Sequence, residues 1–143
     1  MLSQFNNIQF NINKQMKSIF IIYVADQAKS KYFYQEVLQK EALLDVPGMT
    51  EFEINEQSKL GIMPEKGIAK ILGENIVHPS KGNGIPRCEI YLYVNSPDDY
   101  FERAIRYGAK PLSETLVRDW GDKVAYCSDL DGNILAFAQK TTS

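Results

Sequence analysis

The chain has 143 residues, of which 44% are hydrophobic and 24% charged, and its formal net charge is −2. This size suits one compact domain or two small modules that share a core. A charge so near neutral, without a basic run, argues against nucleic-acid binding, and no apolar run is long enough to span a bilayer. Because the N-terminus also lacks a secretory signal, we expect a cytoplasmic protein.

Four segments follow one another along the chain. Residues 1–15 are rich in Asn and Gln, and we expect an extension that is poorly ordered or lies over the surface, in which Phe10 and Ile12 could add a short strand. The other segments are predicted to be module one, a linker or lid, and module two: 16–64, 65–86 and 87–143.

Module one begins with a strand at 18–24, after which Asp26 caps a helix at 28–39. Phe33 and Val37 lie at the spacing of a buried helix face. The rest of the module predicts three strands, at 41–46, 50–54 and 59–63.

The linker lacks clear periodicity and is punctuated by Gly and Pro, which predicts a loop with a short helical turn at 68–72. The only histidine, His78, lies in this loop. It is a candidate general base, although a lone loop histidine is more typical of a surface residue.

Residues 87–94 alternate without a break, which is the signature of a strand whose two faces meet different surroundings. One face is aliphatic and suits packing under helices: Cys88, Ile90, Leu92 and Val94. The other face carries one base, one acid and two phenols, a plausible set for a pocket wall: Arg87, Glu89, Tyr91 and Tyr93.

After this strand, Ser96 and Pro97 predict a capped helix that ends at Gly108. The remaining strands are expected at 110–112, 115–119, 123–128 and 134–139. A turn at Asp131-Gly132 is a strong hairpin signal. This strand, cap and helix repeat the start of module one, so we interpret the chain as two copies of a βαβββ module. Cys127 and Cys88 both fall on predicted strands, where reduced core cysteines are typical.

Two motifs carry a resemblance to a known family. The first spans 23–38 and includes Tyr23-Val24-Ala25-Asp26, and the second comprises Trp120-Gly121, Val124-Ala125-Tyr126 and Asp129-Leu130-Asp131-Gly132-Asn133. Both resemble proteins of the glyoxalase, bleomycin-resistance and extradiol-dioxygenase superfamily, also called vicinal oxygen chelate proteins. The resemblance implies an α+β fold in which two βαβββ modules form a curved half-barrel sheet around a cavity, within a homodimer.

Members of that family commonly hold a divalent metal such as nickel or zinc with four side chains on the first and last strands of the modules. Carried over one at a time, these positions fall at Ile19, at Gly61 or Ile62, at Glu89 and at Ala136. Only Glu89 has a donor atom, and such centres need three or four protein ligands. We therefore expect no metal and no cofactor.

The chain then resembles the metal-free, bleomycin-resistance branch, and we expect an aromatic or basic small molecule in the cavity. The predicted ligand-binding residues come from three strands or turns: Ile21, Tyr23, Glu89, Tyr91, Tyr93 and Trp120. A carboxylate against apolar walls favours a cationic or hydrogen-bond-donating ligand. Arg87 could instead pair with Glu89, the tyrosines could pack as a sheet face, and Trp120 could only shape its hairpin.

Two other classes of function remain open. One is a lyase or isomerase of the lactoylglutathione-lyase type, which is metal-dependent, or a metal-free isomerase in which Glu89 is the catalytic base. The other is a non-catalytic protein whose dimer surface is the functional part. A closed cavity filled by side chains would favour this last interpretation.

Overall fold

The structure is a computed structural model that describes residues 16–141, so the predicted extension at 1–15 lies outside the described residues. Eight strands and three α-helices occur in the described range. Their bounds are β1 Ser18–Val24, α2 Gln27–Leu38, β2 Leu44–Val46, β3 Met49–Asn55, β4 Ser58–Pro64, α3 Glu65–Leu72, β5 Glu89–Tyr93, α4 Pro97–Arg106, β6 Lys110–Val117, β7 Asp122–Ser128 and β8 Ile134–Lys140.

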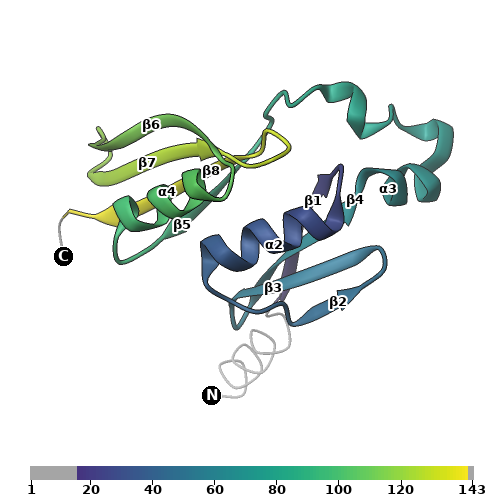
Figure 1. Cartoon of the computed structure of the whole chain (residues 1–143), viewed down its shortest axis with the longest axis horizontal. Coiled ribbons are helices and arrows are strands. Elements are labelled where there is room, and N and C mark those ends of the chain that lie inside the picture. Colours follow the sequence, from purple (N-terminus) through teal and green to yellow (C-terminus); the bar gives the residue numbers. More distant parts are fainter. Residues whose placement is uncertain (1–15, 142–143) are drawn as a thin grey trace, which may run out of the picture.

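The strands form two four-stranded sheets of the same design. One has the order β1-β4-β3-β2 and the other β5-β8-β7-β6. In each sheet the first and last strands of a module pair in parallel, and the other pairs are antiparallel. Figure 1 shows the two sheets beside each other, with α2 and α4 packed against them. The predicted α+β fold of two βαβββ modules is confirmed, as curved sheets that do not close.

One core joins the modules on the helix side of the sheets. Phe33 and Val37 of α2, Phe52 of β3 and Ala104 of α4 are all buried there, together with Phe137 of β8. Burying each of these phenylalanine and valine side chains contributes about 1.5–3 kcal/mol. The caps form as predicted, because Asp26 and Ser96 accept hydrogen bonds from the first turns of α2 and α4. The aliphatic face of the alternating strand at 87–94 packs against this core, as its pattern predicted.

The turn between β7 and β8 fastens module two to module one. The buried Asp129 carboxylate accepts a hydrogen bond from the Tyr34 hydroxyl of α2 at 2.5 Å, and also binds the Asn133 amide. Asp131 accepts a hydrogen bond from the backbone N–H of Ala25 at 2.8 Å. Burial and the Asp129 carboxylate raise the pKa of Tyr34 well above its usual value, so the hydroxyl stays a donor.

Two details of module two differ from the sequence-based expectation. The strands predicted at 110–112 and 115–119 are one edge strand, β6, whose pairing shifts register near Pro111 and Ser113. Proline removes a donor and is tolerated at such an edge. Cys127 is buried as predicted, but Cys88 is exposed just before β5, so its assignment to a core strand was wrong.

The linker is more helical than its composition suggested. A full helix, α3, replaces the predicted turn at 68–72, and two short 3₁₀ turns follow at Gly73–Asn75 and Pro79–Gly82. None of the α3 residues is buried, and Figure 1 shows the helix at the edge of the molecule. Between residues 16 and 141 no helix has the length and apolarity needed to cross a membrane.

Candidate functional site

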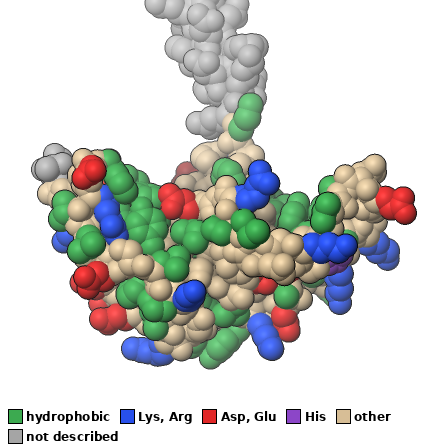
Figure 2. All heavy atoms as spheres, turned by 90° about the horizontal axis from the view of Figure 1, so that it is seen from above, with side chains coloured by type: hydrophobic (Ala, Val, Ile, Leu, Met, Phe, Trp, Pro, Cys, Tyr) green, Lys and Arg blue, Asp and Glu red, His purple; other side chains and the backbone are tan. Residues whose placement is uncertain are grey.

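The face of the sheets that turns away from the core carries exposed apolar side chains. We call it the open face, and its exposed members come from both modules: Ile19, Ile21, Tyr23, Tyr93, Leu116 and Trp120. In Figure 2, hydrophobic side chains form broad exposed areas over the left and middle parts of the molecule. Apolar surface that gathers in this way marks a place of interaction.

Module two holds an ordered cluster on this face. The Asp122 carboxylate, only 5% exposed, accepts hydrogen bonds from the Tyr91 hydroxyl at 2.6 Å and the Tyr93 hydroxyl at 3.0 Å. The Trp120 indole N–H donates to the Tyr91 oxygen at 3.0 Å. The two tyrosine rings meet edge to face with centroids 5.5 Å apart. We call these four residues the Asp122 cluster.

Local sequence explains how the cluster forms. Tyr91 and Tyr93 lie two residues apart on β5 and therefore share a face. Their register partners on β8 are Ala136 and Ala138, whose small side chains are fully buried and leave room for the rings. Gly121 has φ +94°, a conformation that glycine adopts without strain, and it turns the chain so that β7 begins at Asp122.

The cluster keeps its phenols neutral. Burial, followed by the hydrogen bond to Asp122, raises the pKa of Tyr91 to about 12. For Tyr93 the hydrogen bond to Asp122 is the main cause of a raised pKa. Both hydroxyls therefore remain donors to one carboxylate even at alkaline pH where a free phenol ionises, and two aromatic rings are held in fixed positions beside an exposed indole.

Other polar groups lie next to the cluster. The guanidinium carbon of Arg118 lies 5.1 Å from the centre of the Tyr126 ring, and the same guanidinium donates a hydrogen bond to the Val124 carbonyl at 2.9 Å. Burial and the negative charge of Glu89 raise the pKa of Tyr126. The ammonium of Lys140 lies 5.3 Å from the centre of the Tyr93 ring. Two aromatic rings of the open face therefore already bind cationic side chains of the protein itself.

The structure brings only part of the predicted ligand set together. Tyr91, Tyr93 and Trp120 are in direct contact, whereas Ile21 and Tyr23 share the open face but belong to the other sheet.

Glu89 also faces the open side, and it is exposed. No ion pair joins it to Arg87 within residues 16–141, and Arg87 lines a hollow beside the linker. The general base envisaged at Glu89 needed burial, and this single chain does not supply it.

Sequence reasoning missed Asp122, because the predicted strand began only at 123. The available signal was the alternation of Asp122, Val124 and Tyr126 on β7, which places the carboxylate on the same face as the tyrosines. His78 has a local role. Its Nδ1 lies 2.8 Å from the Ser80 hydroxyl and accepts the Ser80 backbone N–H, which caps the second 3₁₀ turn.

The four positions that would hold the family's metal do not form a donor set here. A side chain at Gly61 would meet Ile21 at 2.9 Å and Ile19 at 3.1 Å, so hydrocarbon fills that place. Ala136 is fully buried in a small hydrophobic group with Val124 and Ala138, and Tyr91 packs against this group. No group of three potential His, Cys, Asp or Glu ligands occurs within the described residues. The side chains present therefore do not fit a divalent ion at these positions.

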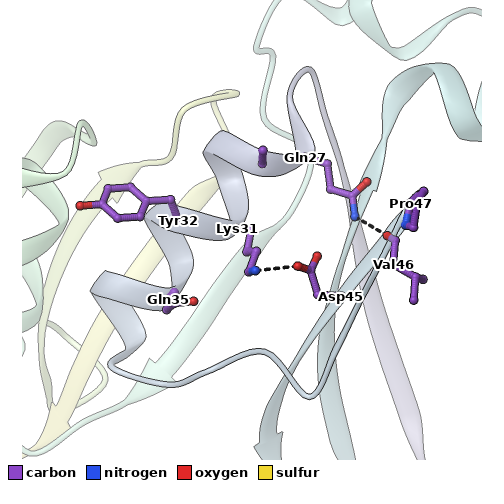
Figure 3. A pocket seen from close by; sticks show the side chains of 8 residues that line it. Gln27, Lys31, Tyr32, Gln35, Asp45, Val46 and Pro47 are labelled. Atoms are coloured by element: carbon purple, nitrogen blue, oxygen red, sulfur yellow. Dashed lines mark hydrogen bonds and ion pairs between the residues drawn. The ribbon is translucent and has the colours of Figure 1, made fainter.

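A hollow of about 560 Å³ lies away from the open face, between α2 and β2 (Figure 3). Lys31 and Asp45 form an ion pair at 2.6 Å across it, and this pair lowers the pKa of Asp45. The Gln27 amide binds the Val46 carbonyl at 2.8 Å. Because these polar groups satisfy one another, we assign the hollow to the packing of the β2 turn and the candidate site to the open face.

Comparison with known proteins agrees with this fold. A model of the Glyoxalase/Bleomycin resistance protein/Dioxygenase superfamily matches residues 15–137. A glyoxalase-related enzyme from Fulvimarina pelagi superposes with a TM-score of 0.75 at 18% identity over 88% of each chain. A glyoxalase/bleomycin resistance protein/dioxygenase family enzyme from Burkholderia phytofirmans PsJN gives a TM-score of 0.74 at 15% identity, over 85% of this chain and 96% of its own. No curated protein sequence matches the chain.

The paired βαβββ modules and the open curved face define the vicinal oxygen chelate class of protein. The chain belongs to the glyoxalase/bleomycin resistance/dioxygenase superfamily.

Proposed function

We propose that the protein binds a small organic ligand, aromatic or basic, on its open face and without a metal. The observation that supports this most is the Asp122 cluster. One buried carboxylate orients two phenols, and Trp120 next to them is 59% exposed. Small-molecule sites combine such aromatic walls with a few fixed polar groups.

The negative charge in and beside the Asp122 cluster favours a cation or a hydrogen-bond donor as ligand. Asp122 and Glu89 contribute negative charge, and the faces of aromatic rings attract cations. Lys140, 5.3 Å from the centre of the Tyr93 ring, occupies the kind of position that a ligand ammonium would take. A planar organic cation could stack on Trp120 and Tyr93 together.

A second copy of the chain would complete the site. The open face leaves Ile21, Tyr93, Leu116 and Trp120 each more than 40% exposed. We propose a homodimer in which these side chains meet the partner, and in which the ligand is enclosed between the copies. The cytoplasmic location remains a prediction from the sequence, to be checked by cell fractionation.

A thermal-shift screen with planar organic cations tests the ligand proposal, since a compound that binds only the folded state raises the unfolding midpoint. We expect stabilising compounds whose effect is lost in Tyr93→Ala and strongly reduced in Glu89→Ala. Tyr32→Ala is the control, because Tyr32 is an exposed tyrosine on α2 away from the open face. Unchanged affinity in both open-face variants would contradict the proposal.

The alternative is a metal-dependent lyase or isomerase of the lactoylglutathione-lyase type. The metal content of protein purified without a histidine tag, followed by nickel and zinc titration, separates it from our proposal. We expect substoichiometric metal and no stabilisation by either ion. Tight stoichiometric metal, or metal-dependent turnover of a hemithioacetal, would establish the alternative.

A further inference from the structure

The linker creates a second hollow, of about 290 Å³, where the two modules meet. Its walls come from the end of β1, the start of α3, the loop before β5 and the β7–β8 turn: Tyr23, Glu65, Pro79, Ile85, Arg87 and Asn133. Asn133 directly precedes β8, whereas Asp122 pairs with Lys140 at the other end of that strand. With about 3.3 Å per residue, Asp122 lies roughly 20 Å from Asn133 along the strand, and Tyr91 of the cluster, which pairs with Ala136, lies roughly 10 Å from it.

A backbone contact holds the loop in place. Gly84 has φ +73° and Gly132 has φ +90°, and a Cβ added to Gly132 would lie 2.8 Å from the Cα and O atoms of Gly84. Only glycine allows two chains to approach so closely. The loop therefore sits directly on the β7–β8 turn, and the hollow is part of the packed fold.

Two opposite charges line the hollow without neutralising each other. Glu65 and Arg87 come from different ends of the linker, and no ion pair joins them in the part of the chain that the structure describes. The third charged group, Asp131, is already engaged by the Ala25 N–H at 2.8 Å and the Ser30 hydroxyl at 3.4 Å. One carboxylate and one guanidinium thus remain to meet a ligand.

We propose that this hollow binds a small zwitterion, namely a free α-amino acid, whose ammonium pairs with Glu65 and whose carboxylate pairs with Arg87. Arginine binds carboxylates through two parallel hydrogen bonds, so it orients that end. The volume lies near the small end of ligand pockets, which suits a molecule of this size. Tyr23, which is 41% exposed, supplies an aromatic wall for the side chain.

Thermal unfolding of the full chain with single L-amino acids at millimolar concentration tests the proposal. We expect at least one amino acid to raise the midpoint by a few degrees, because it binds the folded state alone. Its N-acetyl and amide derivatives, which each lack one charge, should lose the effect. No stabilising amino acid, or equal stabilisation by either derivative, would overturn the assignment.

Variants locate the effect. Glu65→Gln and Arg87→Gln should each weaken the apparent affinity at least tenfold, while Lys66→Gln, a neighbouring exposed change on α3, should leave it unchanged. Amide chemical shifts of the wild-type protein supply a readout that needs no variant. They should move at residues 79–85 and 131–133 on adding the amino acid, and shifts confined to the Asp122 cluster would place the binding elsewhere.

Discussion

Asp122 acts as the anchor of the open face, since one of its oxygens accepts both phenol hydrogen bonds. In Asp122→Asn a neutral amide replaces the carboxylate and weakens both bonds. The two phenols then lose the hydrogen bonds to a charged group that fix their orientation, so we expect ligand affinity to fall about tenfold. Ligand affinity is measured by titrating the ligand into each variant. Asp119→Asn, an exposed change beside Trp120, is the matched control. Equal affinity in the two variants would remove Asp122 from the site.

The raised pKa of Tyr91 predicts how the stability of the protein responds to alkaline pH. Its pKa rises from an ordinary 10.0 to about 12, so between these values the unfolded chain has lost a proton that the folded chain still holds. The contribution of Tyr91 to stability is complete below pH 10 and is lost as pH rises toward 12.

In urea titrations over this range, Tyr91→Phe should show a shallower fall in the free energy of unfolding than wild type. The absorbance of tyrosinate should confirm that the variant lacks one late-titrating phenol. A fall of the same steepness in both proteins would contradict the raised pKa of Tyr91.

The hydrogen bond between α2 and the β7–β8 turn couples the two modules at the scale of elements. Tyr34→Phe removes the donor to Asp129 while Asp129 keeps its bonds to Asp131 and Asn133. We expect the free energy of unfolding to fall by about 1–3 kcal/mol, as for other hydrogen bonds to charged groups. Tyr32→Phe on the same helix, whose ring is exposed, should change stability little in the same urea titration. A negligible loss for Tyr34→Phe would show that this hydrogen bond does not couple the modules.

Sequence patterns predicted the elements whose two faces differ. The alternation at 87–94, the repeat of this strand at 18–24 and the caps at Asp26 and Ser96 were enough to place both helices on one side and the tyrosines on the other. Helix α3 was predicted only as a turn, because it buries nothing and its composition is punctuated by glycine. Asp122 was missed because a carboxylate after Trp-Gly is typical of a turn, and its partners lie about thirty residues away.

At the scale of the whole molecule, the apolar open face is exposed to solvent in the single chain. We predict that analytical ultracentrifugation gives twice the mass of one chain. Ile21→Glu and Leu116→Glu should shift the protein toward the monomer, because each would bury a charge in the interface. Val77→Glu, in the exposed linker, is the control. A monomeric wild-type protein at micromolar concentration would contradict the dimer.

The most direct test of metal-free binding on the open face uses the single tryptophan of the chain, Trp120, as its reporter. Its emission should be followed while planar organic cations are titrated into the protein in the presence of excess chelator. We predict a saturable change for at least one cation, unaffected by the chelator and lost in Tyr93→Ala. A response that appears only after nickel or zinc is restored would instead show that the ligand reaches this face through a metal.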